Sequence, residues 1–119
     1  MKKLLLMAIL LLTFGAANAQ IADVQVKGSW INVYDANGKE ISSMSASGKE
    51  VVGVTGTFFV VVVGSWINVY DEKCKEISSM SSSGKTVRGA SGNSFTVKVG
   101  SWINTYDKNC KEIASRSAN

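Results

Sequence analysis

The sequence GSWINVYD, which runs from Gly28 to Asp35, occurs three times in this chain. It returns unchanged from Gly64 to Asp71, and as GSWINTYD from Gly100 to Asp107. The tryptophans of the three copies, Trp30, Trp66 and Trp102, are therefore spaced 36 residues apart. A fixed period of this length is typical of repeat architectures, so the motif predicts a fold built from repeated supersecondary units.

The residues around the motif predict short strands. Segments such as Trp30–Tyr34 and Phe58–Val63 are rich in β-branched and aromatic residues and are bounded by turn signals. Asn37-Gly38 predicts a hairpin turn, because both residues readily adopt the positive φ that such a turn needs. A full unit then has four strands, the chain starts at the second strand of a unit, and we expect 11 strands in total.

The last repeat differs from the middle one on one face of its strands. Phe59, Val61 and Val63 have the apolar counterparts Phe95, Val97 and Val99. The residues between them become polar: Phe58 to Ser94, Val60 to Thr96, and Val62 to Lys98. Because side chains on a strand alternate between faces, we expect the middle sheet to be covered on both faces. The last sheet should have one face in water, as a terminal repeat does.

The N-terminal residues predict a secretory signal peptide. Lys2 and Lys3 precede an apolar segment, and Ala17-Asn18-Ala19 is a small-residue cleavage pattern. We therefore expect a signal peptide at residues 1–19, cleavage near Ala19, and an exported protein, periplasmic or secreted, with no membrane span. Residues 20–119 should form a single β-repeat domain, with units at about 21–48, 49–84 and 85–119.

Four short antiparallel strands in a unit of about 36 residues resemble a β-propeller blade. Stretches such as FFVVVVGSWINVYDEKCKEI resemble the second to fourth strands of quinoprotein-like propeller repeats. The resemblance implies an all-β fold and says nothing about activity. A β-trefoil or β-prism is the alternative fold. An open or self-associating stack is favoured over a six-bladed ring made of two chains, because ring closure would bury the polar face of the last unit.

Composition argues against several functions. The formal net charge of +4 falls to +2 once Lys2 and Lys3 are removed, and the basic residues are dispersed, so we expect no nucleic-acid partner. The chain has no histidine, which is the commonest general base and metal ligand. No nucleophile elbow, phosphate loop or zinc spacing is present either. We therefore expect no enzyme activity, no cofactor and no metal.

The candidate ligand-binding residues are the aromatic and amide residues of the repeated strand. Trp, Asn and Tyr alternate along it and so share one face. Aromatic rings stack on sugar CH groups and amides bond hydroxyls, although packing between sheets is the favoured role for such aromatics, because large aromatic side chains dominate the energetics of protein cores. The candidates are Trp30, Asn32, Tyr34, Trp66, Asn68, Tyr70, Trp102, Asn104 and Tyr106.

Two cysteines and three aspartates occupy equivalent turn positions. Cys74 and Cys110 stand where the first unit has Gly38. Equivalent turns of adjacent units should be too far apart for a disulfide, so we expect free or intermolecular thiols and strain where a side chain replaces glycine. Each Asp of the motif (Asp35, Asp71, Asp107) should bond the backbone of its own turn, as Asp does before tight turns.

The sequence thus predicts an exported, non-catalytic binding or adhesion module whose ligand is a glycan or a protein. The alternatives are a structural or self-assembling protein, in which other chains cover the apolar middle unit, and a fragment of a larger propeller.

Overall fold

The computed structural model describes residues 20–118, so the predicted signal peptide at residues 1–19 lies outside the described residues. This part of the chain contains eleven strands and no helix, as the repeat pattern predicts. The strands are β1 (Asp23–Lys27), β2 (Trp30–Tyr34), β3 (Glu40–Ser45), β4 (Lys49–Val54), β5 (Phe58–Val63), β6 (Trp66–Asp71), β7 (Glu76–Ser81), β8 (Lys85–Ser91), β9 (Ser94–Val99), β10 (Trp102–Asp107) and β11 (Glu112–Ser117). Within residues 20–118, nothing helical is available that could cross a membrane.

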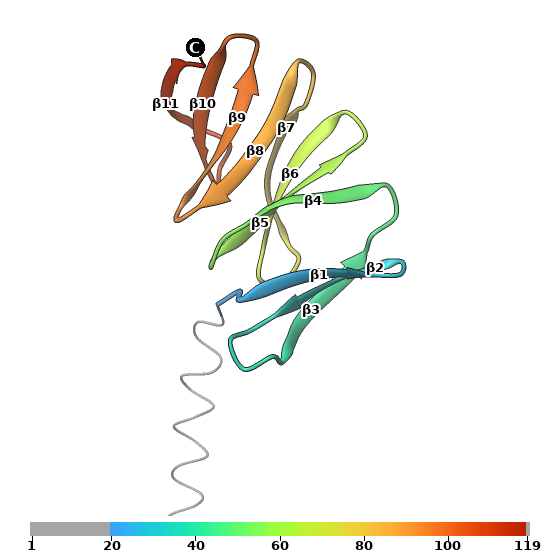
Figure 1. Ribbon diagram of the computed structural model, residues 1–119. Helices are drawn as coiled ribbons and strands as arrows, with labels where there is room; N and C mark the ends of the chain where they lie inside the picture. Colours follow the sequence, from blue (N-terminus) through green and yellow to red (C-terminus); the bar gives the residue numbers. More distant parts are fainter. Residues whose placement is uncertain (1–19, 119) are drawn as a thin grey trace, which may run out of the picture.

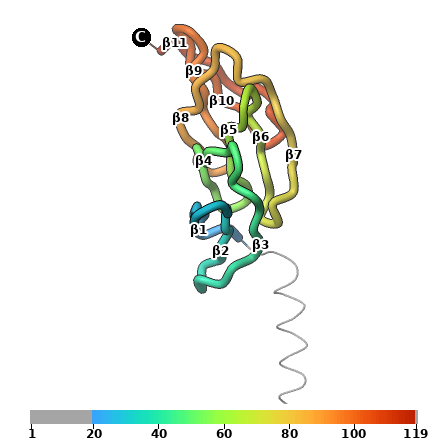
Figure 2. Tube along the Cα trace, turned by 90° about the vertical axis from the view of Figure 1, so that its right-hand side faces the viewer, coloured from blue at the N-terminus to red at the C-terminus, as the bar shows by residue number. Residues whose placement is uncertain are grey.

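The strands form three antiparallel sheets, in which strands that are consecutive along the chain are neighbours. The first sheet has the order β1-β2-β3, the middle sheet β4-β5-β6-β7, and the last sheet β8-β9-β10-β11. The sheets follow one another like the ribs of a fan, from the first (blue) to the last (red) (Figure 1). In the perpendicular view they again succeed one another along the molecule (Figure 2). Each sheet lies inside one of the predicted repeat units.

The turn after the repeated motif has the same construction in each sheet. In the first, Asp35 Oδ1 accepts hydrogen bonds from the backbone N–H of Asn37 at 2.9 Å and of Lys39 at 3.0 Å. Asp71 and Asp107 accept the equivalent bonds in the other two sheets. The expected role of these aspartates is confirmed. Because the carboxylates are engaged in their own turns, they fix the hairpins and hence the register of the strands that follow.

Two apolar clusters hold the sheets together. Ile31 and Val33 of the first sheet pack against Phe59, Val61 and Tyr70 of the middle sheet. On the other face of the middle sheet, Phe58, Val60, Ile67 and Val69 pack against Phe95, Val97 and Tyr106 of the last sheet. Phe58 and Phe95 meet edge to face across this second junction, with ring centroids 6.4 Å apart. The middle sheet is thus covered on both faces by sheets of its own chain. Other chains are not needed to cover it, which removes one reason for expecting self-association.

The outer faces of both terminal sheets are polar. On the last sheet Arg88, Lys98 and Arg116 are exposed on the face that points away from the middle sheet, as the comparison of repeats predicts. The first sheet shows the same property, which the sequence comparison missed. Its Asp23, Gln25 and Lys27 are exposed and take the places of Phe59, Val61 and Val63. The stack therefore has a polar surface at each end.

The innermost strands of the middle and last sheets, β4 and β8, lie against each other along the inner edge of the fan (Figure 1). Their closest approach is at Gly53, where an added Cβ would lie 2.9 Å from the Cβ of Ala90 and 3.3 Å from its backbone nitrogen. The first sheet has no strand in the equivalent position within the described residues, so the inner edge of β1 is unpaired there.

Candidate functional site

The three Trp/Asn/Tyr sets have the geometry that strand alternation predicts. Each set lies on the face of its sheet that points toward the start of the chain, so the second and third sets face the preceding sheet. The first set, Trp30, Asn32 and Tyr34, has no preceding sheet within the described residues. The structure therefore places the nine residues in three equivalent arrangements, one for each sheet.

The tryptophans and the tyrosines differ in burial. Trp30, Trp66 and Trp102 are 53%, 52% and 53% exposed. Tyr70 and Tyr106 are 7% and 8% exposed, since each stacks on a phenylalanine of the adjacent strand and lies in a junction between sheets. Tyr70 and Tyr106 are therefore packing residues. The tryptophans are equally exposed whether or not a sheet precedes them, so the junctions do not explain why they are there.

The Asn side chain is held in one orientation. Its Nδ2 donates to the hydroxyl oxygen of the tyrosine two residues on, at 3.3 Å in the first sheet, 3.2 Å in the middle sheet and 3.4 Å in the last sheet. In the last sheet Asn104 Oδ1 also accepts a hydrogen bond of 2.7 Å from Ser115 Oγ. A polar group held in this way can meet a ligand with little loss of side-chain freedom.

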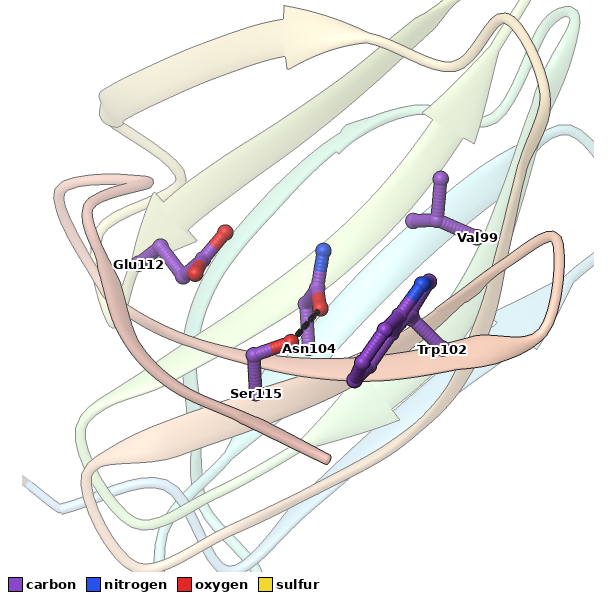
Figure 3. Close-up of a pocket in the computed structure, with 5 residues that line it drawn as sticks. All are labelled: Val99, Trp102, Asn104, Glu112 and Ser115. Atoms are coloured by element: carbon purple, nitrogen blue, oxygen red, sulfur yellow. Dashed lines mark hydrogen bonds between the residues drawn. The ribbon is translucent and has the colours of Figure 1, made fainter. Parts of the chain in front are cut away.

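An open hollow of about 240 Å³ lies over this part of the last sheet and is lined by Val99, Trp102, Asn104, Glu112 and Ser115. Trp102 and Glu112 flank the Asn104–Ser115 hydrogen bond on opposite sides (Figure 3). The hollow therefore combines a flat aromatic surface with an amide, a hydroxyl and a carboxylate.

Three of these residues, Val99, Glu112 and Ser115, are not among the candidates that the sequence predicts. Glu112 and Ser115 lie on the strand that neighbours the repeated motif. The signal was present in the hairpin register, because Asn32, Asn68 and Asn104 lie opposite Ser43, Ser79 and Ser115 on the adjacent strand. The middle sheet repeats all five lining residues as Val63, Trp66, Asn68, Glu76 and Ser79. The first sheet differs only by Lys27 in the place of the valine.

The two cysteines lie at the junctions between sheets. Ser42 of the first sheet donates to the carbonyl oxygen of Glu72 at 2.6 Å and lies 3.3 Å from Cys74 Sγ. Ser78 makes the equivalent contacts with Lys108 O, at 2.6 Å, and with Cys110 Sγ, at 3.2 Å. Each sheet thus holds the hairpin turn of the next sheet through one serine hydroxyl.

Both thiols are free, and both turns carry the expected strain. Cys74 and Cys110 have φ values of 60° and 61°, where the first sheet has Gly38 at 78°. The cysteine side chains pack on the apolar clusters, whereas a Cβ at Gly38 would meet nothing within 4 Å. Cysteine therefore occurs where a preceding sheet is present to receive it. Burial raises the pKa of both thiols, against the smaller opposing effect of the serine hydrogen bond, so they are poor nucleophiles at neutral pH.

A second hollow, of about 340 Å³, lies among turns and is lined by Thr57, Asn93, Asp107, Lys108 and Asn109. The carboxylate of Asp107 already accepts two backbone hydrogen bonds of its own turn. Within residues 20–118 there is no group of three or more residues of the types that bind metal ions.

Neither a protein-family model nor a curated protein matches the sequence. Solved structures do match the fold. One is KlHsv2 with loop 6CD replaced by a Gly-Ser linker, at a TM-score of 0.55 and 14% identity, over 87% of this chain and 36% of that one. Another is Hsv2 of Kluyvelomyces marxianus, at a TM-score of 0.53 and 16% identity, over 85% of this chain and 40% of that one.

Hsv2 is a β-propeller of the WD40 type, so the three sheets match part of a propeller. The predicted all-β fold of propeller-like repeats is confirmed, in preference to a trefoil or prism. The chain spans well under half the length of the structures it matches. At these identities the likeness concerns the fold alone.

Proposed function

We propose that the protein is an exported, non-catalytic glycan-binding module in which each sheet carries one sugar-binding subsite. The observation that carries the proposal is the half exposure of Trp30, Trp66 and Trp102, which is nearly equal in the three sheets. Exposing a tryptophan ring is unfavourable when nothing covers it, and a ring exposed to the same extent three times suits a repeated ligand contact.

The residues beside Trp102 support a sugar as the ligand. An indole face stacks on the CH groups of a pyranose ring, and the Asn104 amide, the Ser115 hydroxyl and the Glu112 carboxylate can bond its hydroxyls. Tyr106 acts through Asn104, whose amide it orients, and is too buried to be a contact itself. In this proposal Tyr34 and Tyr70 are likewise positioning residues for Asn32 and Asn68.

The same hollow supports a binding role without catalysis. Glycoside hydrolysis ordinarily needs two carboxyl groups on either side of the scissile bond. Of the residues that line the hollow, Glu112 alone is acidic. The near identity of the three sets also suits repeated binding of one kind of unit along a polymeric ligand.

A glycan array followed by fluorescence titration of residues 20–119 tests the proposal. We expect saturable binding to at least one carbohydrate class with a change in tryptophan emission. Replacing all three tryptophans by alanine removes every tryptophan of the chain, so the binding of this variant is followed by titration calorimetry and should be weaker by at least about ten-fold, or about 1.4 kcal/mol. Ile113→Ala is the matched control, because Ile113 is an apolar side chain of β11 that is 57% exposed and does not line the hollow. Absence of binding to any carbohydrate, or unchanged affinity of the triple variant, would overturn the proposal.

A second candidate is that the chain forms part of a larger propeller or assembly. It is favoured by the limited share of the matched propellers that the chain spans. The charged and polar residues on the outer faces of the terminal sheets count against it, since they stand where the middle sheet has the apolar residues of its junctions. Light scattering and urea unfolding of the isolated chain distinguish the two: a monomer that unfolds cooperatively supports the binding module, and an obligate oligomer supports the assembly.

A further inference from the structure

The first sheet has an unfilled strand position. In the middle sheet β4 pairs with the inner edge of β5, and in the last sheet β8 pairs with the inner edge of β9. The corresponding edge of β1 has no partner among residues 20–118. In the strand order of residues 20–118, β3, β7 and β11 are also terminal strands, but this holds for all three sheets alike. The inner edge of β1 differs from them because its counterparts are filled.

The backbone of β1 is arranged to accept a strand. In the middle sheet Gly53 pairs with Val60 and Glu50 pairs with Val62. By the register of the hairpins, Val24 and Val26 stand in the places of Val60 and Val62. Their N–H and C=O groups therefore face the empty position. Val26 is 53% exposed, whereas Val62 is partly buried beside β4.

In the middle sheet, the side chain of Val54 is also incompletely covered next to this position. Val54 of β4 is 37% exposed, and its counterpart in β8, Ala90, packs against Gly53 of β4. A strand beside β1 would meet Val54 as β4 meets Ala90. Since even a methyl group on Gly53 would approach Ala90 to 2.9 Å, the residue opposite the larger Val54 has to be glycine.

We propose that the inner edge of β1 binds an extended segment of another polypeptide as a fourth, antiparallel strand. The segment carries an aliphatic residue followed by glycine, as Val52-Gly53 does in β4. The aliphatic side chain and the glycine face Val51 and Val54 of β4, and the alternate residues face solvent. A second copy of this chain does not supply the segment from its described residues, because β4, which has this pattern, is already paired in its own sheet, and the equivalent pair in β8 is Arg88-Gly89. Strand addition to an open sheet edge is a common mode of peptide recognition.

The probe is a synthetic peptide with the sequence of residues 48–56, GKEVVGVTG, titrated into residues 20–119 and followed by NMR. We expect one peptide to bind per chain and to slow amide exchange at Val24 and Val26. The same peptide with valine in the place of Gly53 should bind at least about ten-fold more weakly. In the protein, Val26→Pro removes an edge N–H and should weaken binding at least about ten-fold. Val26→Thr keeps that N–H and the strand preference, so it is the matched control and should bind as the wild type does.

The proposal is overturned if the peptide does not bind at millimolar concentration, or if Val26→Pro and Val26→Thr bind it equally. It is also overturned if the Gly53 and valine peptides are indistinguishable. Carbohydrate binding by Val26→Pro should be unchanged, because the Val26 side chain lies on the face of the first sheet opposite to Trp30. The two proposals can therefore fail separately.

Discussion

Gly53→Ala tests the packing of the inner strands most directly. The added methyl group would lie 2.9 Å from Ala90 Cβ and 3.3 Å from Ala90 N, against an ordinary carbon–carbon contact of about 3.5–4.0 Å. Either the middle and last sheets separate or the strands bend, and overpacking of this kind costs about 1–3 kcal/mol. Gly53 does not have a positive φ, so alanine is allowed there and restricts the unfolded chain, which returns about 0.4–1 kcal/mol. We expect a net loss of about 1–2 kcal/mol.

Urea unfolding followed by tryptophan fluorescence measures this loss. In a domain of this size it corresponds to a melting temperature lower by about 4–16 °C. Gly56→Ala is the control, because its nearest contact is the end of the Gln20 side chain at 3.6 Å and its φ is not positive. It should be neutral or slightly stabilising.

Ala90→Gly in the Gly53→Ala background moves the methyl group from one strand to the other. The double variant should recover most of the lost stability, which gives a coupling energy of about 1 kcal/mol or more. A Gly53→Ala protein within about 0.5 kcal/mol of wild type, or a double variant no more stable than the single one, would refute the close approach of β4 and β8.

Three further predictions concern the junctions and the end of the stack. Ser78→Ala should cost about 1 kcal/mol, because it removes the hydrogen bond to the next sheet, whereas Ser83→Ala, on an exposed turn, should be neutral in the same unfolding assay. The folded pKa of the Cys110 thiol is raised by burial, so its contribution to stability is complete below the ordinary thiol pKa of 9.0 and is lost as the pH rises through the folded pKa. Cys110→Ala should therefore lose less stability than wild type as the pH rises above 9.0, and parallel pH profiles would contradict this. The double variant Lys98→Val and Arg116→Met gives these two positions of the last sheet the apolar residues that the middle sheet has there. It should cause concentration-dependent self-association in light scattering. A strict monomer would show that these charges do not cap the stack.

The number and class of the elements follow from local patterns. Eleven strands and a polar last face could be predicted, because the signals for them are short-range. These signals are the Asn37-Gly38 turn, the Asp that precedes each turn, and the residues that alternate with Phe59, Val61 and their counterparts, which are apolar in the middle repeat and polar in the last. The polar first face is less evident, because Val24 and Val26 of β1 predict a strand but do not show which repeat positions their neighbours occupy. The register of the hairpin places Asp23 and Gln25 in the positions of Phe59 and Val61.

The site was only partly predictable for a physical reason. Trp, Asn and Tyr share a face through strand alternation, which is visible in one strand. Glu112 and Ser115 come from the neighbouring strand, and their position depends on the hairpin register and on the bulge between Thr105 and Tyr106. The unequal burial of Trp102 and Tyr106 could not be read from the sequence at all, because it depends on how far the preceding sheet extends over the strand.

The two apolar faces of the middle sheet determine where a further repeat could be added to this protein in evolution. A second copy of residues 49–84 inserted after residue 84 would meet the existing sheets through the same apolar residues that form the present junctions. It would also bring the serine and the cysteine that fix one turn to the next sheet. A copy added at either end would face Asp23, Gln25 and Lys27, or Lys98 and Arg116, in the places where the junctions have apolar residues. Growth by internal duplication is therefore compatible with the fold, and growth by extension is not.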